Sequence, residues 1–192
     1  MTNDILKHMP DVFADLCCSL KRTSKDDTNG QYMTESKLQV INFDRVPKIY
    51  AKGKNWKGVP KSNDALYIDH NGQWYFIEFK NGQIRKDEIY RKIYDSIIMS
   101  LELGAVSNLD FIRQNCQYIL VYNDEKISGI QHSVSRTDIS NYVFSLAKTE
   151  KKLFGVQDFE QYLIKEAHTY TIDEFEQKFA GPMEQMGQSY TS

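Results

Sequence analysis

The sequence contains few cysteines and no long apolar run, and both absences restrict what the protein can be. Two of the three cysteines are the adjacent Cys17 and Cys18, which are badly placed to bridge each other, and no Cys-x-x-Cys occurs. No apolar segment approaches the length of a membrane span, and the N-terminal residues lack the apolar core of a signal peptide. We therefore expect a cytoplasmic protein that has no membrane partner.

Several catalytic signatures are also missing. The four histidines form no His-Glu-x-x-His motif and no zinc-binding pattern with cysteine. Neither a Gly-x-Ser-x-Gly elbow nor a dinucleotide-binding fingerprint occurs. The sequence thus gives little support to a zinc enzyme, to a serine hydrolase of the α/β-hydrolase type, or to a dinucleotide-dependent oxidoreductase.

Positive charge is not in excess overall, but it is unevenly distributed. The formal net charge is −2, from 24 Lys and Arg against 26 Asp and Glu. Residues 45–92 carry eleven basic and five acidic side chains, whereas residues 150–192 carry four and eight. The basic excess would favour a phosphate-containing partner near residues 45–92. Ordinary solvent-exposed lysines explain the same excess equally well.

Length and composition favour a single folded domain. Of the 192 residues, 41% are apolar and 12% are aromatic, which is enough for a sizeable core and argues against disorder. We expect one domain over residues 1–180. Gly181 and Pro182 predict the end of its last helix, followed by a flexible tail over residues 181–192.

Residues 61–92 predict a strand, a tight turn, a second strand and the start of a long helix. Trp74–Lys80 is rich in aromatic and β-branched residues, and its alternation places Glu78 and Lys80 on one face. Both faces of this strand are otherwise apolar, so we expect layers on both sides of the sheet. Ala65–Asp69 is the predicted partner strand. The helix is expected over Arg85–Leu103, with Gly104 ending it.

Asp64 and the group Glu78-Phe79-Lys80, set in a hairpin that a helix follows, resemble the PD-(D/E)xK nuclease superfamily. The resemblance spans residues 45–125, and Asn63 occupies the position of the proline in the superfamily's name. It implies a restriction-endonuclease-like fold, an α/β fold with a mixed β-sheet flanked by helices and, here, additional C-terminal helices. A cross-strand ion pair at a wet sheet edge is the alternative explanation of Glu78 and Lys80.

The resemblance also implies a function, namely a Mg²⁺- or Mn²⁺-dependent endonuclease that hydrolyses phosphodiester bonds of DNA, with RNA as the alternative. Asp64 and Glu78 would bind the metal ion, with the Phe79 carbonyl as a further ligand. Lys80 would position the attacking water. The superfamily often brings a basic residue to the site from the next helix, and Lys92 is our candidate, although an ordinary exposed lysine fits as well.

The superfamily often supplies one more acid upstream. Glu35 and Asp15 are the two candidates here, and both are also consistent with plain surface acids. The basic loop over residues 53–60 contains Trp56, which would either stack on a base of a nucleic acid or fold back onto the core.

The turn between the two strands tests the nuclease hypothesis. A two-residue turn at Asn71-Gly72 would place Asp64 and Glu78 on opposite faces of the sheet. A three-residue loop, His70-Asn71-Gly72, with positive φ at Gly72, would set Asp64 directly opposite Glu78. Opposed residues share a face. The nuclease hypothesis therefore predicts the three-residue loop.

The remaining segments complete the expected architecture. An amphipathic helix is predicted over residues 4–22, or from near Met9 with Pro10 in its first turn. A polar loop is expected over 24–31, and either 38–43 or 46–51 forms the first core strand. The apolar run Cys116–Tyr122 predicts a buried strand that is joined to Trp74–Lys80 by a parallel crossover. Helices are expected over 138–148, 157–166 and 171–180, the last capped by Thr171 with Glu174.

Two other function classes stay open. One is a nucleic-acid-binding module of the same fold that does not cleave. The other is a protein–protein interaction module that uses the acidic C-terminal part as its surface.

Overall fold

A mixed six-stranded β-sheet forms the centre of the computed structural model, which describes residues 8–126 and 152–189. The strand order is β1-β4-β5-β6-β7-β8. Pairing is antiparallel from β1 to β6 and parallel from β6 to β8. The strands are β1 (Cys17–Ser19), β4 (Gln39–Asn42), β5 (Ala65–Ile68), β6 (Trp74–Lys80), β7 (Cys116–Tyr122) and β8 (Glu166–Thr171). The predicted α/β class with a mixed, helix-flanked sheet is confirmed.

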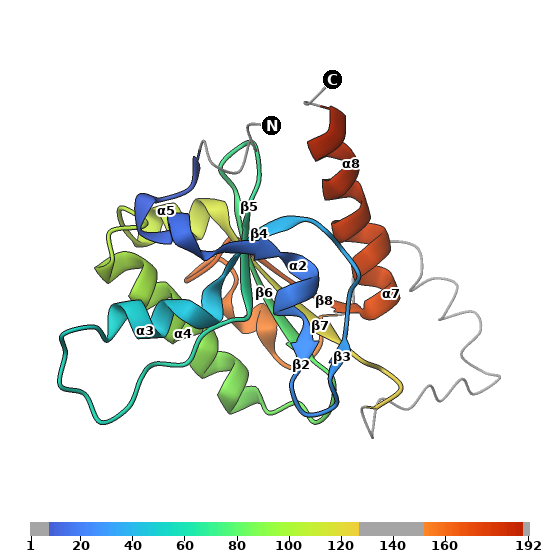
Figure 1. Cartoon of the computed structure of the whole chain (residues 1–192), viewed down its shortest axis with the longest axis horizontal. Helices are drawn as coiled ribbons and strands as arrows, with labels where there is room; N and C mark the ends of the chain where they lie inside the picture. The colour runs from blue at the N-terminus through green and yellow to red at the C-terminus, as the bar shows by residue number, and fades with distance from the viewer. Residues whose placement is uncertain (1–7, 127–151, 190–192) are drawn as a thin grey trace.

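The sheet is covered on both faces, as the apolar pattern of β6 predicts. Trp74 and Phe76 pack with Ile93 of helix α4 (Lys86–Glu102) in one hydrophobic cluster. Tyr75 and Ile77 join a second cluster on the opposite face with residues of the C-terminal helices. Figure 1 shows α3 (Val46–Tyr50), α4 and α5 (Leu109–Asn115) on one side of the sheet, and α7 (Ile172–Phe175) and α8 (Gly181–Ser189) on the other. Strand β6 is therefore enclosed between two cores.

The segment from β6 to β7 follows the prediction closely. Helix α4 lies within the expected bounds, and Gly104 takes a left-handed φ of 69° just beyond its end, which suits a residue without Cβ. Strand β7 covers the predicted Cys116–Tyr122 and pairs in parallel with β6 over seven residues. The parallel crossover is thus confirmed.

The N-terminal prediction is wrong for the described residues. In place of one long helix there is a 3₁₀ segment, η1 (Asp11–Leu16), then β1 and a single turn, α2 (Leu20–Thr23). Strand β1 pairs with β4, and this non-local backbone pairing outweighs the local helical pattern. The helical spacing still marks the apolar contacts, since Phe13, Leu16 and Leu20 are all buried.

Two further segments also differ from expectation. The predicted polar loop at 24–31 contains a short hairpin of β2 (Lys25–Asp26) and β3 (Gln31–Tyr32). Of the two candidates for the first core strand, residues 38–43 supply β4, whereas residues 46–50 form the helix α3 after the 3₁₀ turn η2 (Phe43–Arg45). Pro47 lies in the first turn of α3, where its missing N–H is tolerated.

The C-terminal part contains a strand that the sequence pattern did not reveal. A helix over 157–166 is wrong, because the 3₁₀ turn η3 (Val156–Phe159) ends before Gln161, whose φ is +69°, and β8 begins at Glu166. The capping box of Thr171 and Glu174 is present at the start of α7. The predicted helix at 138–148 lies outside the described residues.

The last helix does not end at Gly181 and Pro182. A π-helical segment, η4 (Glu176–Ala180), continues directly into α8, so residues 181–189 are helical where we expected a flexible tail. A Cβ on Gly181 would lie 2.9 Å from the Glu176 carbonyl oxygen, so this junction requires glycine. The Glu184 carboxylate accepts hydrogen bonds from the backbone N–H groups of Lys37 and Leu38, at 2.7 and 3.1 Å, which anchors α8.

Within the described residues, no helix is both long enough and apolar enough to cross a membrane.

Candidate functional site

The hairpin β5–β6 has the three-residue loop that the nuclease hypothesis predicts. Leu66 pairs with Phe76, and the backbone N–H of Asp69 donates to the carbonyl of Gln73 at 3.0 Å, which leaves His70-Asn71-Gly72 as the loop. Gly72 has a φ of +75°. Continuing this register outward sets Asp64 opposite Glu78. The two carboxylates therefore share one sheet face.

Glu78 is fully buried and is held by two lysines. The Lys92 Nζ lies 2.6 Å from Oε1 and 2.8 Å from Oε2 of Glu78. The Lys80 Nζ lies 3.0 Å from Oε1. A buried carboxylate needs such partners, because an unpaired charge in the core is strongly unfavourable. The structure thus brings the predicted Lys92 to the site.

Asp64 lies at the same point and completes the group. Its Oδ1 accepts from the Lys92 ammonium at 3.1 Å, and its Oδ2 accepts from the backbone N–H of Phe79 at 2.6 Å. The Lys92 ammonium is therefore shared by two acidic side chains from neighbouring strands. Phe79 contributes a backbone donor here, and its role as a carbonyl ligand stays a prediction.

The electrostatics of Glu78 follow from its burial. Loss of hydration, and to a lesser extent the nearby Asp64 carboxylate, raise the pKa of Glu78, the ammonium groups of Lys92 and Lys80 oppose that rise, and the net pKa is about 8. For Lys92, the burial lowers its pKa while the carboxylates of Asp64 and Glu78 raise it, and the net effect is upward. We therefore treat Lys92 as charged and Glu78 as the member of the pair that can take up a proton.

Asp44 is the acid at this site that the sequence did not single out. It lies in η2, just after β4, and accepts a hydrogen bond from the Ser62 hydroxyl at 3.1 Å. Its side chain is exposed to the pocket, and partial dehydration by nearby protein atoms, together with the Asp64 charge, raises the pKa of Asp44 to about 6. The signal that could have found Asp44 is its position two residues beyond a core strand.

The two predicted upstream acids lie elsewhere. Glu35 is exposed and pairs with Lys21 at 2.6 Å, and Asp15 is an exposed residue of η1. Neither lines the pocket beside Asp64. Both fit the alternative that they are surface acids.

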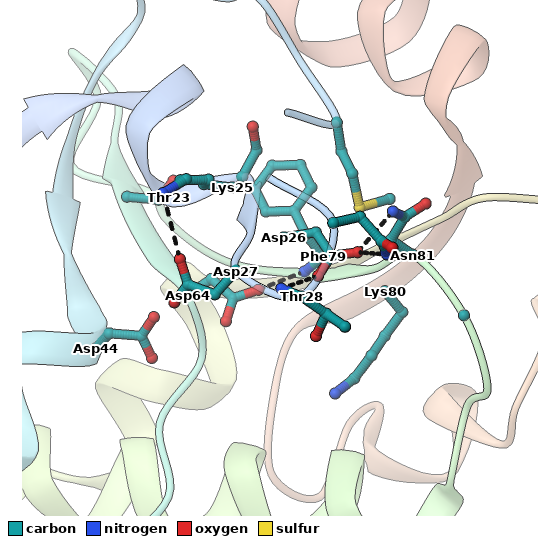
Figure 2. Close-up of a pocket in the computed structure, with 14 residues that line it drawn as sticks. Thr23, Lys25, Asp26, Asp27, Thr28, Asp44, Asp64, Phe79, Lys80 and Asn81 are labelled. Atoms are coloured by element: carbon teal, nitrogen blue, oxygen red, sulfur yellow. Dashed lines mark hydrogen bonds and ion pairs between the residues drawn. The ribbon is translucent and has the colours of Figure 1, made fainter. Parts of the chain in front are cut away.

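A pocket of about 420 Å³ adjoins these side chains. Figure 2 shows Asp44, Asp64 and Lys80 around it, beside the Asp26–Thr28 segment. Its lining combines the end of the β5–β6 hairpin with the segment that contains β2, namely Thr23–Asn29, Met33, Asp44, Asp64 and Phe79–Gly82. The pocket therefore gives a ligand access to Asp44, Asp64 and Lys80, whereas Glu78 lies behind them.

The wall of the pocket is fixed by Asp26. Its carboxylate accepts from the backbone N–H of Thr28 at 2.9 Å and from the amides of Asn29 and Asn81 at 2.7 and 2.8 Å. These bonds hold the pKa of Asp26 at about 2, so the residue stays ionised. Asn81 follows β6 directly, so this network ties the β2–β3 hairpin to the strand that carries Glu78 and Lys80.

Tyr118 lies on β7 close to the buried carboxylate. Its hydroxyl is buried and has no hydrogen-bond partner among the residues that the structure describes. Burial, Glu78 and Asp64 all raise the pKa of Tyr118, so it remains a neutral phenol. Both side-chain amide atoms of Asn63 are likewise buried without a partner within 8–126 and 152–189. The layer beneath the site is thus incompletely hydrogen-bonded.

A divalent cation is compatible with the donor set, subject to one condition. Oxygen ligands suit Mg²⁺ and Mn²⁺, and Mg²⁺ is commonly held by one or two carboxylates with water completing its shell. Asp64 and Glu78 already share one cation, the Lys92 ammonium. The described residues contain no group of three or more His, Cys, Asp or Glu arranged to hold a metal. A metal ion held by both Asp64 and Glu78 would therefore compete with the Lys92 ammonium.

Comparisons with family models, with curated proteins and with solved structures found no match for this chain. The geometry of the site is therefore the basis for assigning a function.

Proposed function

We propose that the protein is a Mg²⁺- or Mn²⁺-dependent nuclease of the PD-(D/E)xK type, with a restriction-endonuclease-like fold and DNA as its expected substrate. The observation that carries this proposal is the convergence of Asp64, Glu78 and Lys80 at the end of one hairpin, beside a pocket. The order of antiparallel hairpin, helix and parallel strand supports the fold assignment.

Each side chain of the site would have a distinct role in phosphodiester hydrolysis. Bound Mg²⁺ would polarise the scissile phosphate and lower the pKa of a water molecule. Asp64 and Glu78 would hold the ion, and Asp44 would add a carboxylate from across the pocket. Lys80 lines the pocket, so its ammonium would orient the attacking water and offset negative charge that develops on the phosphate oxygens.

In this proposal Lys92 has two positions. In the metal-free protein its ammonium lies between Asp64 and Glu78, and it offsets their mutual repulsion whenever Glu78 is ionised. When an ion binds, the ammonium would move toward the pocket, where it can contact a substrate phosphate. Its side chain is 17% exposed, so it is not locked in the core.

A non-catalytic nucleic-acid-binding module is the second candidate, and the same lysine favours it. Lys92 already satisfies both carboxylates, and Glu78 has no exposed surface. A protein in which this ammonium never leaves would have a stable site without a metal ion. It would bind nucleic acid with strong salt dependence and would not cleave it.

A cleavage assay separates the two candidates. The full chain is incubated with plasmid, single-stranded DNA and RNA, with Mg²⁺, Mn²⁺ or EDTA. Nuclease function predicts metal-dependent cleavage that Glu78→Ala abolishes while the variant still melts cooperatively. Binding without cleavage of any polymer would support the non-catalytic module.

A further inference from the structure

The segment from η2 through α3 into the connection to β5 is basic and largely exposed. Residues 45–61 carry six basic side chains and no acidic one. Residues 52–59 are all exposed, and so are the flanking basic residues. The six are Arg45, Lys48, Lys52, Lys54, Lys57 and Lys61. Such a surface attracts a polyanion.

Trp56 is held on this surface with its indole partly open to solvent. It is 48% exposed, in contrast to Trp74, which is 2% exposed. The rings of Trp56 and Tyr50 have centroids 5.2 Å apart, and the Lys54 ammonium lies 3.8 Å from the Tyr50 centroid and 4.4 Å from the Trp56 centroid. The indole therefore did not fold into the core, and a cation and a second ring restrict its motion.

Two acids lie near this group, Glu102 and, at the Lys61 end, Asp95, whose carboxylate accepts from the backbone N–H of Lys61 at 2.8 Å. Glu102 makes the side-chain contacts. It accepts a hydrogen bond from the Tyr50 hydroxyl at 2.6 Å and lies 3.5 Å from the Lys54 ammonium. It thereby fixes Tyr50 and offsets part of the charge of Lys54. Within the described residues the side-chain ammonium groups of Lys52 and Lys57 make no hydrogen bond or ion pair, so these two charges remain available to a ligand.

The surface is close to the pocket. Asp44 lines the pocket, and Tyr50 ends the helical segment that begins at Phe43. From Asp44 to Tyr50 the chain passes through a 3₁₀ turn and then α3, six residues that span about 9–11 Å along the axis. A flexible chain that occupies the pocket can therefore reach the Trp56 indole.

We propose that Tyr50, Lys52, Lys54, Trp56 and Lys57, here called the Trp56 platform, bind single-stranded nucleic acid by stacking one base on the indole while the lysines contact the backbone. The positive charge selects a polyanion, and the half-exposed, restricted indole selects one that carries flat bases. A duplex keeps its bases paired and stacked, so the platform favours single strands. The platform deepens the proposed nuclease function by naming its substrate class.

The test uses binding alone, so that it can fail separately from the nuclease proposal. Oligothymidylate is titrated into the full chain in EDTA, and tryptophan fluorescence is recorded together with the anisotropy of a labelled strand. Because Trp74 is buried, quenching reports on Trp56. We expect quenching by the base-bearing strand and much less by an abasic strand of equal length.

Variants test separately what the Trp56 indole and the lysines contribute to binding. Trp56→Ala should weaken binding about 5- to 150-fold, the range for loss of one base–aromatic stack, and Trp56→Phe should retain most of the affinity. Lys52→Gln with Lys57→Gln should reduce the salt slope of log K by about 1.4. Tyr162→Ala, at another 50% exposed aromatic residue, is the matched control and should bind like the parent.

Three results would overturn the platform. These are no binding to any single strand, equal quenching by the abasic strand or by polyglutamate, and a Trp56→Ala variant that binds as tightly as the parent. Loss of cleavage in Glu78→Ala with unchanged binding would leave the platform standing and bear on the catalytic site alone.

Discussion

The Lys92 ammonium contacts both carboxylate oxygens of Glu78, at 2.6 and 2.8 Å, and Glu78 has no exposed surface. The two residues come from α4 and β6, so the pair ties the crossover helix to the central strand. The Asp64 carboxylate shares the same ammonium. This one contact therefore governs the stability, the pH response and the metal affinity of the site.

Removing the ammonium should destabilise the protein. Lys92→Met leaves Glu78 with Lys80 as its remaining cation, and we expect a loss of about 3 kcal/mol, the lower end of the range for breaking a buried pair. The free energy of unfolding is measured by urea denaturation above pH 8, where Glu78 is ionised. Lys86→Met, at an exposed lysine of the same helix, is the control and should change stability little. An equal, small loss in both variants would contradict the assigned pairing.

Stability should also respond to pH in a defined direction. Burial raises the folded-state pKa of Glu78 to about 8, so between about pH 5 and that value the folded protein binds more protons than the unfolded chain. Relative to low pH, where Glu78 is protonated in both states, the free energy of unfolding therefore falls as the pH rises toward 8. Glu78→Gln removes the titration, whereas Asp44, with a pKa of about 6, titrates in both proteins.

The measurement is the difference in unfolding free energy between the parent and Glu78→Gln, in EDTA. As the pH rises from about 5 to about 8, we expect the free energy of unfolding of Glu78→Gln to increase relative to that of the parent. A difference that stays constant, or that shifts toward the parent, would show that Glu78 is ionised throughout.

A divalent cation should stabilise the folded state in competition with Lys92. An ion that binds only the folded chain stabilises it by about 2.7 kcal/mol at a hundredfold excess over Kd. We expect Mn²⁺ to raise the Tm of the parent, and to raise that of Lys92→Met by more, each relative to its own metal-free value. Glu78→Ala should show no rise. Equal shifts in all three proteins would place the ion elsewhere.

Substitutions can also test whether Asp44 is the third acidic residue of the site, beside Asp64 and Glu78. Asp44→Asn should reduce metal-dependent cleavage about 10- to 100-fold, because the pocket then loses a carboxylate that faces Asp64. Glu35→Gln and Asp15→Asn should cleave at the parental rate, since neither residue lines the pocket. A greater effect of Glu35→Gln than of Asp44→Asn would reverse the assignment.

Local patterns predicted the part of the fold that carries the site. The alternation of Trp74–Lys80 fixes which residues share a face, and a glycine at position 72 permits the left-handed φ that a three-residue loop needs. These two features together set Asp64 opposite Glu78. The resemblance to the superfamily, and not a local pattern, predicted that Lys92 reaches this pair. It does so because α4, which carries Lys92, begins soon after β6.

Elements that depend on distant partners were missed. The residues of β1 and β8 are strands because β4 and β7 pair with them, and neither segment has an alternation of its own that outweighs helical spacing. Asp44 was overlooked because its closeness to Asp64 arises from the antiparallel pairing of β4 with β5. The junction at Gly181 and Pro182 continues because a π-helical turn precedes it.

The most direct test of the central claim is metal-dependent cleavage by Asp64→Asn, Glu78→Gln and Lys80→Met, compared with the parent and with Glu35→Gln. Each substitution removes charge with little change in size, and cooperative melting confirms that each variant is folded. The account predicts cleavage by the parent and by Glu35→Gln, and none that exceeds the metal-free background in the three site variants. Parental rates in all three, under conditions where the parent cleaves with Mg²⁺ or Mn²⁺, would contradict it.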